Sequence, residues 1–330
     1  MQILLNLVLS IIIIALIFHL AGIGKVFAVL AGASPGYLLL ALLSYLCLNI
    51  VMSFRIKKVL QSLGESLALR QILPSNLAGL LASDFTPARS GYFFTAFSLS
   101  SKSGIRLDKT MMAIFGPQIF DFLIKASSAG ILIFLLMGRA GIGNLLINAA
   151  VLAFIFAGII GAGALVFHPP LLERLSPLRR LPLMPRLFGF IGRMHEHSDK
   201  VMAVKWTVVW ITLLSWAIKG MEWLFLAKAL GIGFFGDFLS DFLFMMVFQG
   251  AVTIIQFLPI PTLAGAGASE AGFAAILLSF GVSVESGIAF AFMTRILMIA
   301  VDILSLPVIF GYLHTHSLEK SLESLSELRH

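Results

Sequence analysis

The sequence predicts an all-α polytopic membrane protein with about six full transmembrane helices and two opposed re-entrant hairpins in an inverted repeat. The first reason is composition: 59% of the residues are hydrophobic and 12% are charged, with a mean hydropathy of +1.01, whereas soluble domains carry about 25% charged residues. The second reason is that apolar runs of about 20 residues recur along the chain, enough to cross a hydrocarbon core of about 30 Å. A transmembrane β-barrel would instead show alternating segments of about ten residues.

Six apolar runs are long enough to be full spans. They are Ile3–Leu20, Gly36–Phe54, Thr110–Met137, Asn144–Phe167, Trp206–Leu230 and Gly287–Tyr312. The longest polar stretch, residues 167–205, is predicted to be a basic loop, so residues 1–330 form a single transmembrane domain. Because no soluble domain, nucleophile–base pair or metal site is visible, we expect a protein that is not an enzyme, with no catalytic residues, no metal and no cofactor.

Two further apolar regions are interrupted in the middle. Residues 71–100 are broken at Ser83–Gly91, and residues 238–281 are broken at Pro259–Gly267. Most of the resulting arms have about a dozen residues, too few to cross a bilayer. Each region is therefore predicted to be a re-entrant hairpin, although residues 238–258 are long enough to cross alone, and that choice stays open.

The positions of the basic loops orient the chain. Residues 55–70, 101–109 and 167–205 are rich in Lys and Arg, and the loop 231–237 has none. Since positive loops stay in the cytoplasm, the first hairpin should enter from the cytoplasm and return to it. The second hairpin then enters from the opposite side, and both termini are expected to be cytoplasmic, in the plasma membrane.

This layout places a span, a hairpin and a span in residues 36–137, and again, inverted, in residues 206–312. Inverted repeats with broken helices are typical of secondary transporters, whose substrate sites lie at the breaks. Irregular backbone at membrane depth is tolerated only where it is buried in protein or lines a cavity. The sequence therefore favours transport, with its site between the two hairpins.

The first break has the chemistry of an anion site. Thr86 is a predicted N-cap and Pro87 suits the first helical position, so a helix N-terminus, which favours anions, is expected there. Arg89 makes this end more positive, and a guanidinium binds phosphate through two hydrogen bonds. Two alternatives remain: Arg89 pairs with Asp84, or it extends to the cytoplasmic headgroups.

The second break combines glycines with a carboxylate. Gly265 and Gly267 allow close approach of the backbone, and Ser269 is a plausible N-cap. Glu270 then lies in the first helical turn, where a carboxylate is favoured by the helix dipole alone. Because ionisable groups inside a membrane are costly, Glu270 is also a candidate proton or cation site, or a partner for Arg295.

Other ionisable residues inside the spans have helical neighbours of opposite charge. Pairs three or four residues apart share a helix face, which predicts internal neutralisation, and Lys228 is close enough to a helix end to extend to the headgroups. The pairs are Asp121 with Lys125, Lys219 with Glu222 and, two turns apart, Arg295 with Asp302. The net charge of +7 and a pI of about 9.7 fit basic loops beside anionic lipid and argue against nucleic-acid binding.

These segments resemble the lysylphosphatidylglycerol synthase transmembrane region family, whose members are also described as flippase-like. Its first motif, Pro-Gly/Ala-Arg-x-Gly-Glu, is similar to Pro87–Tyr92, which includes Gly91. Its second motif, a Pro followed by Gly-x-Gly-x-x-Glu, is similar to Pro261 with Gly265–Glu270. The family's Arg in the following span corresponds to Arg295, and its Arg-x-x-Asp after the first motif corresponds to Gln118–Asp121.

Two positions depart from the family pattern. Tyr92 stands in place of a glutamate and Gln118 in place of an arginine, so a charge pair of the family is absent or rebuilt here. The resemblance implies movement of an anionic lipid, a phospholipid or polyprenyl phosphate, between leaflets.

From the residues and the resemblance together, a lipid path would run between the hairpins. In this hypothesis Arg89 and the helix end at Thr86 hold the phosphate, and Glu270 with Arg295 form the opposite wall. The sequence leaves open a proton- or cation-coupled transporter of small solutes, and a non-catalytic subunit that docks a lipid-modifying synthase through residues 167–205. Homo-oligomerisation is equally open.

Overall fold

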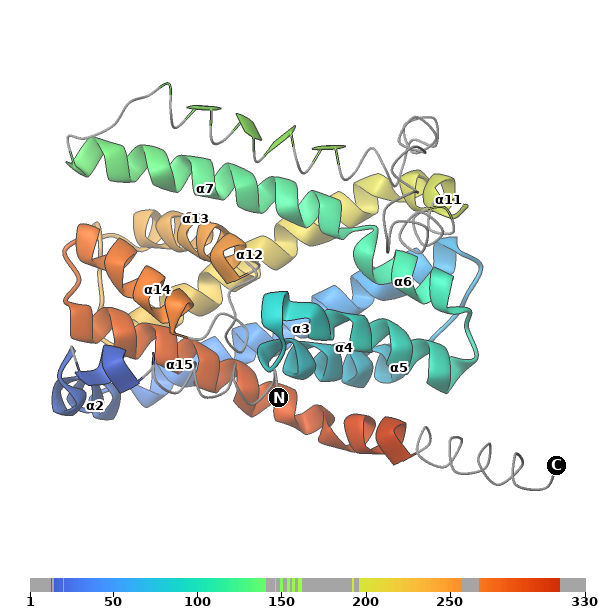
Figure 1. The fold of residues 1–330 in the computed structure, drawn as a ribbon, viewed down its shortest axis with the longest axis horizontal. Helices are drawn as coiled ribbons and strands as arrows, with labels where there is room; N and C mark the ends of the chain where they lie inside the picture. The colour runs from blue at the N-terminus through green and yellow to red at the C-terminus, as the bar shows by residue number, and fades with distance from the viewer. Residues whose placement is uncertain are drawn as a thin grey trace.

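A computed structural model gives the fold, and every regular element in the described part of the chain is helical (Figure 1). The structure describes residues 13, 15–19, 21–140, 146, 149–150, 153–154, 156–157, 160–161, 192, 196–256 and 267–314. The all-α polytopic architecture predicted from the sequence is confirmed.

The elements follow one another as helices of very different lengths. They are α2 (Ile23–Ala31), α3 (Pro35–Ser62), α4 (Leu69–Asp84), η1 (Pro87–Tyr92), α5 (Phe93–Ser103), α6 (Leu107–Phe115), α7 (Gln118–Ala140), α11 (Ser198–Ala203), α12 (Lys205–Ala229), α13 (Phe238–Gln256), α14 (Ala268–Ser279), α15 (Val284–Asp302) and η4 (Ile303–Ser305).

Four helical stretches in the described residues are long and apolar enough to cross a membrane: Pro35–Ser62, Leu107–Gly138, Lys205–Ala229 and Val284–His314. They correspond to four of the predicted spans. The other two, Ile3–Leu20 and Asn144–Phe167, lie largely outside the described residues, so a total of six stays a prediction.

The boundaries differ from the predicted ones where local chemistry overrides hydropathy. Helix α3 begins at Pro35, which follows Ser34 in extended conformation, and continues for 28 residues, well past the predicted end at Phe54. The third span is interrupted at Pro117, because proline cannot continue the hydrogen-bond ladder. The segment between the first two predicted spans contains α2, whose Lys25 lies 3.4 Å from Glu285 of α15.

Helices α4 and α5 form an antiparallel pair joined by η1. The hydroxyls of Ser75 and Ser98 lie 3.1 Å apart, and nearer the tip Gly79 packs directly on Thr95. At 16 and 11 residues, these helices are about 24 and 17 Å long, shorter than the hydrocarbon core. This is the geometry of the first predicted hairpin, while its depth in the membrane stays a prediction.

Helices α13 and α14 form the second pair. Phe244 packs on Phe280 with ring centroids 4.5 Å apart, and Phe248 on Phe273 at 5.6 Å, so the two helices run antiparallel. Trp223 of α12 closes this aromatic cluster at 5.0 Å from Phe273. The predicted break at Pro259–Gly267 lies outside the described residues except for Gly267.

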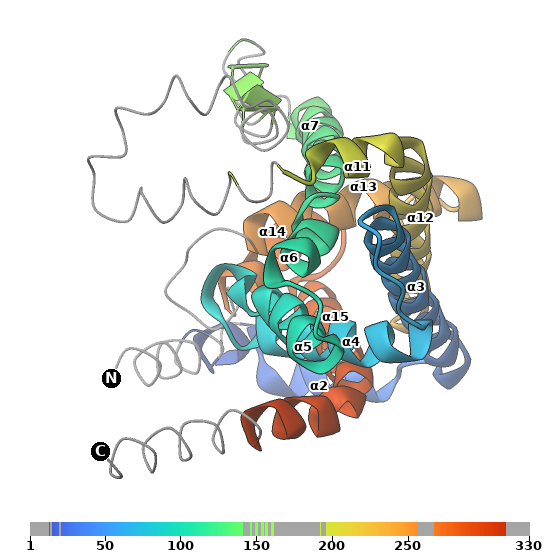
Figure 2. The same cartoon turned by 90° about the vertical axis from the view of Figure 1, so that its right-hand side faces the viewer.

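Both halves of the chain repeat the order of a long helix, two shorter helices and a long helix. Helices α3 and α12 lie side by side, as do α7 and α13 (Figure 2). Close approach between helices uses small residues: a Cβ on Gly250 of α13 would lie 2.6 Å from Ser128 of α7. The inverted repeat, with halves at 36–137 and 206–312, stays a prediction, as does the single-domain division.

Candidate functional site between the two hairpins

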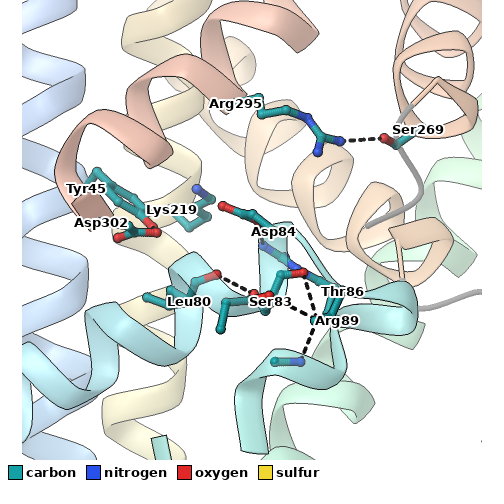
Figure 3. A network of polar contacts seen from close by, with 12 residues as sticks. Tyr45, Leu80, Ser83, Asp84, Thr86, Arg89, Lys219, Ser269, Arg295 and Asp302 are labelled. Carbon is teal, nitrogen blue, oxygen red and sulfur yellow. Dashed lines mark hydrogen bonds and ion pairs between the residues drawn. The ribbon is translucent and has the colours of Figure 1, made fainter. Parts of the chain in front are cut away.

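The first break is built around Arg89 in an unusual backbone conformation. Its φ is 53°, the one positive φ of a residue other than glycine in the described part of the chain. Such a conformation costs about 1–2 kcal/mol. Arg89 Nη2 donates to Asp84 Oδ1 at 2.9 Å (Figure 3). One predicted alternative, pairing of Arg89 with Asp84, is therefore present.

Thr86 is the N-cap residue of η1, as predicted, with extended backbone before Pro87, but its side chain makes no capping hydrogen bond and instead holds the tip of the hairpin. Its hydroxyl donates to the Ala82 carbonyl at 3.0 Å and accepts the backbone N–H of Gly91 at 2.6 Å. The predicted helix that starts at Pro87 is present as a 3₁₀ helix of six residues. Gly91 is buried against α4, and a Cβ there would lie 2.2 Å from the backbone carbon of Ala82.

The second break has a carboxylate with every oxygen engaged. Glu270 Oε2 accepts the N–H of Gly267 at 2.6 Å and the hydroxyl of Ser269 at 2.9 Å. Oε1 accepts from Arg295, whose Nη2 lies 2.7 Å away. The N-cap is Gly267, at φ 89°, and not Ser269 as predicted. The predicted partnership of Glu270 and Arg295 is confirmed; Gly265 lies outside the described residues.

The tip of the first hairpin and the start of α14 face each other across a narrow space of about 20 Å³. Asp84 and Arg89 line it from the first hairpin, and Ser269 and Glu270 line it from the second, with Arg295 beside them. Residues almost 200 positions apart in sequence are thus brought together, as the opposed hairpins predicted.

A larger cavity of about 410 Å³ lies next to it, and Arg89 belongs to the walls of both. Its charged lining residues are Arg89, Asp121, Lys125 and Lys219. Tyr92 and Gln118, the two departures from the family pattern, also line it. The wall also contains aromatic, amide and hydroxyl groups, from Tyr45, Phe93, Phe115, Phe122, Trp216, Asn49, Gln249, Ser90, Ser215, Thr212 and Thr253. Apolar side chains complete it: Leu48, Met52, Leu80, Ile124 and Met298.

The charges around the larger cavity form ion pairs. The predicted pair of Lys219 and Glu222 is confirmed, with Nζ at 2.7 and 2.9 Å from the two carboxylate oxygens. Asp121 has a partner that sequence reasoning missed: Arg55 donates to both of its oxygens, at 2.8 and 3.0 Å. With these partners and Asp84, four cations stand against three carboxylates.

Two other expectations have different outcomes. Arg295 and Asp302 do not pair, because Arg295 binds Glu270 and the Asp302 carboxylate accepts the hydroxyl of Tyr45 at 2.9 Å. Lys228 does not extend to headgroups alone, since its Nζ lies 2.7 Å from Asp241. No local pattern marked Tyr45 or Arg55, because both act across 66 residues or more of sequence.

One group of potential metal ligands occurs in the described residues, away from this site. Side-chain atoms of Asp108, Glu196 and His197 lie within 4.8 Å of one another. Their capacity is partly used, because Asp108 Oδ2 already contacts His197 Nε2 at 3.0 Å and Arg106 at 2.7 Å.

Fold and site together define a polytopic helical membrane protein with a charged cavity beside the place where the first hairpin meets the start of α14. The model of the lysylphosphatidylglycerol synthase TM region family matches residues 3–305, and the chain belongs to that family. Membership places it among membrane domains associated with lipid-related function. No curated protein matches it significantly.

Proposed function

We propose that this protein moves an anionic lipid between the leaflets of the plasma membrane as a flippase or scramblase, and that it is not an enzyme. The head group of the lipid would occupy the larger cavity while the acyl chains remain in the bilayer. Both termini would lie in the cytoplasm, as the basic loops indicate.

The observation that carries the proposal is that Arg89, Lys125 and Lys219 all line the same cavity. Charged side chains at membrane depth are costly and are usually retained for function. Among the described residues that line the cavity, three cations stand against the carboxylate of Asp121, which favours a negatively charged occupant, and a cavity of about 410 Å³ accommodates a phosphate with a small substituent.

A lipid is favoured over a small solute because two residues of the cavity lining are also exposed on the surface. Ser90 and Phe93 belong to its lining and are also exposed. Both lie at the tip of the first hairpin, which the sequence places within the bilayer. An opening there would let acyl chains stay in the membrane while the head group enters.

The test is leaflet exchange in proteoliposomes with fluorescent phosphatidylglycerol and a fluorescent zwitterionic phospholipid. The variants are Arg89→Gln and, as the matched control, Arg106→Gln, whose side chain is 67% exposed. We expect faster exchange of the anionic lipid, and a loss of about tenfold, equivalent to about 1.4 kcal/mol, in Arg89→Gln only.

Two outcomes would contradict the proposal. Equal exchange of both lipids by wild type and Arg89→Gln would remove the phosphate site. No exchange above empty liposomes, with and without a proton gradient, would favour a small-solute carrier or a docking subunit. Thermal unfolding of each variant checks that lost exchange is not lost structure.

A further inference from the structure

Asp302 differs from the other buried carboxylates around the site. Each of the others has a cation within 4 Å: Asp84 with Arg89, Asp121 with Arg55, Glu222 with Lys219, Glu270 with Arg295 and Asp241 with Lys228. Asp302 is fully buried at 0% exposure, and among the described residues it has no ion-pair partner. Its Oδ2 accepts the Tyr45 hydroxyl at 2.9 Å, while Oδ1 has no hydrogen-bond partner.

The charges that face Asp302 do not neutralise it. From α12 comes Lys219, which is already held by both oxygens of Glu222. From the first hairpin come Arg89, paired with Asp84, and Asp84 itself, whose charge repels that of Asp302 (Figure 3). On its own helix, Arg295 is committed to Glu270. A buried ionised carboxylate without a counter-ion costs several kcal/mol.

We propose that Asp302 is a proton-binding site of this protein, with Tyr45 as its contact to the larger cavity. Binding converts the carboxylate to a neutral carboxyl, which removes the buried negative charge that no cation neutralises. Tyr45 both donates to Asp302 and lines the cavity. The geometry thus joins a buried acid to the proposed head-group site through one hydroxyl.

A proton fits this place better than a metal cation. Hard metal ions require several oxygen ligands. Among the described residues, the Tyr45 hydroxyl is the one oxygen that is hydrogen-bonded to the Asp302 carboxylate. The ammonium of Lys219 lies 4.9 Å from the centre of the Tyr45 ring, where it would repel a metal ion. The neutral acid is compatible with that ammonium.

The test is the infrared C=O band of protonated carboxyls, measured on the full-length protein in lipid nanodiscs while pH is raised from about 4 to about 10. Deuterium exchange identifies the band. We expect wild type to show it near neutral pH and Asp302→Asn to lose it. In Tyr45→Phe the band should persist but disappear over a different pH range.

The matched control is Asp237→Asn. Asp237 is exposed, and the pKa of its carboxyl is held below its usual range because it accepts the backbone N–H of Ser240. This substitution should leave the infrared band that is seen near neutral pH unchanged. Asp84→Asn is the decisive comparison, since Asp84 Oδ2 is also buried without a hydrogen-bond partner.

The site is overturned if wild type has no such band, if the band survives in Asp302→Asn, or if it responds to sodium instead of pH. Loss in Asp84→Asn with retention in Asp302→Asn would assign the proton to Asp84 and would also overturn it. Should Asp302→Asn fold poorly, Asp302→Glu keeps the acid and should move the band without abolishing it.

A consequence for transport rests on the proposed function and is measured separately. Exchange of phosphatidylglycerol by wild type should change about tenfold with pH, and Asp302→Asn should remove that dependence. A band without lipid exchange would leave the proton site in place and reject the transport proposal. Lipid exchange that requires Arg89, in a protein without the infrared band, would support the transport proposal and reject the proton site.

Discussion

Arg55 of α3 and Asp121 of α7 form a two-point ion pair, with Nη1–Oδ1 at 2.8 Å and Nη2–Oδ2 at 3.0 Å. The same Nη1 also donates to the hydroxyl of Thr212 on α12, at 2.8 Å. One guanidinium therefore ties three helices together at the wall of the larger cavity. The planar fork of arginine is suited to this geometry, and lysine is not.

Breaking this pair should be strongly destabilising. We expect Arg55→Met to lower the free energy of unfolding by about 3–5 kcal/mol, because it leaves Asp121 buried without its counter-ion. The double variant Arg55→Met/Asp121→Leu should lose less than the single one. Unfolding in detergent micelles measures both. Arg106→Met, at an exposed pair, should cost no more than about 1 kcal/mol; equal losses at the two positions would refute this assignment.

The tip of the first hairpin should not tolerate a side chain at Gly91. In Gly91→Ala the new methyl would overlap the backbone of Ala82 and Ser83, at 2.2 and 2.3 Å. Overpacking of this kind costs about 1–3 kcal/mol or more. Gly138→Ala is the control, since a Cβ there meets nothing within 4 Å. Thermal unfolding should separate them, and an unchanged Gly91→Ala would show that the tip can open.

Lys125 tests the head-group cavity without touching the Arg89–Asp84 pair. We expect Lys125→Met to slow exchange of the anionic lipid by about tenfold, or about 1.4 kcal/mol, while the zwitterionic lipid is unaffected. Exposed Lys102→Met is the matched control for the loss of one positive charge. If both variants slow exchange equally, the effect is general electrostatics and not a cavity contact.

Glu270 has two structural tasks that substitutions can separate. Glutamine still accepts the N–H of Gly267 as a glutamate does in a capping box, but it cannot neutralise Arg295. Glu270→Ala loses both contacts and should be less stable than Glu270→Gln by about 0.5–2 kcal/mol, the usual range for a lost cap. Thermal melts of the two variants provide the comparison, and identical stability would mean that the cap contributes nothing.

Much of the fold could be predicted because the spans are long and strongly apolar, and such patterns depend little on their surroundings. The interruption at Pro117 and the extension of α3 to Ser62 were missed, since hydropathy does not report where a continuous helix bends or ends. Element boundaries depend on caps and prolines, which act within a single turn.

The site was predictable where partners are close in sequence. Lys219 with Glu222 follows from helical spacing, and Glu270 with Arg295 from their places in one hairpin and the next span. Arg55 with Asp121 and Tyr45 with Asp302 depend on how distant helices pack, which no spacing rule gives. Arg89 combines both: its charge was legible in the sequence, but its left-handed backbone was not.

Arg89 lines both the larger cavity and the narrow space between the first hairpin and the start of α14. A small-molecule inhibitor designed to fill the larger cavity would press on one side of this residue. On its other side Arg89 binds Asp84 and lies next to the second hairpin, so such a compound would also disturb the contacts in the narrow space. Resistance substitutions at position 89 would then carry a cost, because they would alter both spaces at once.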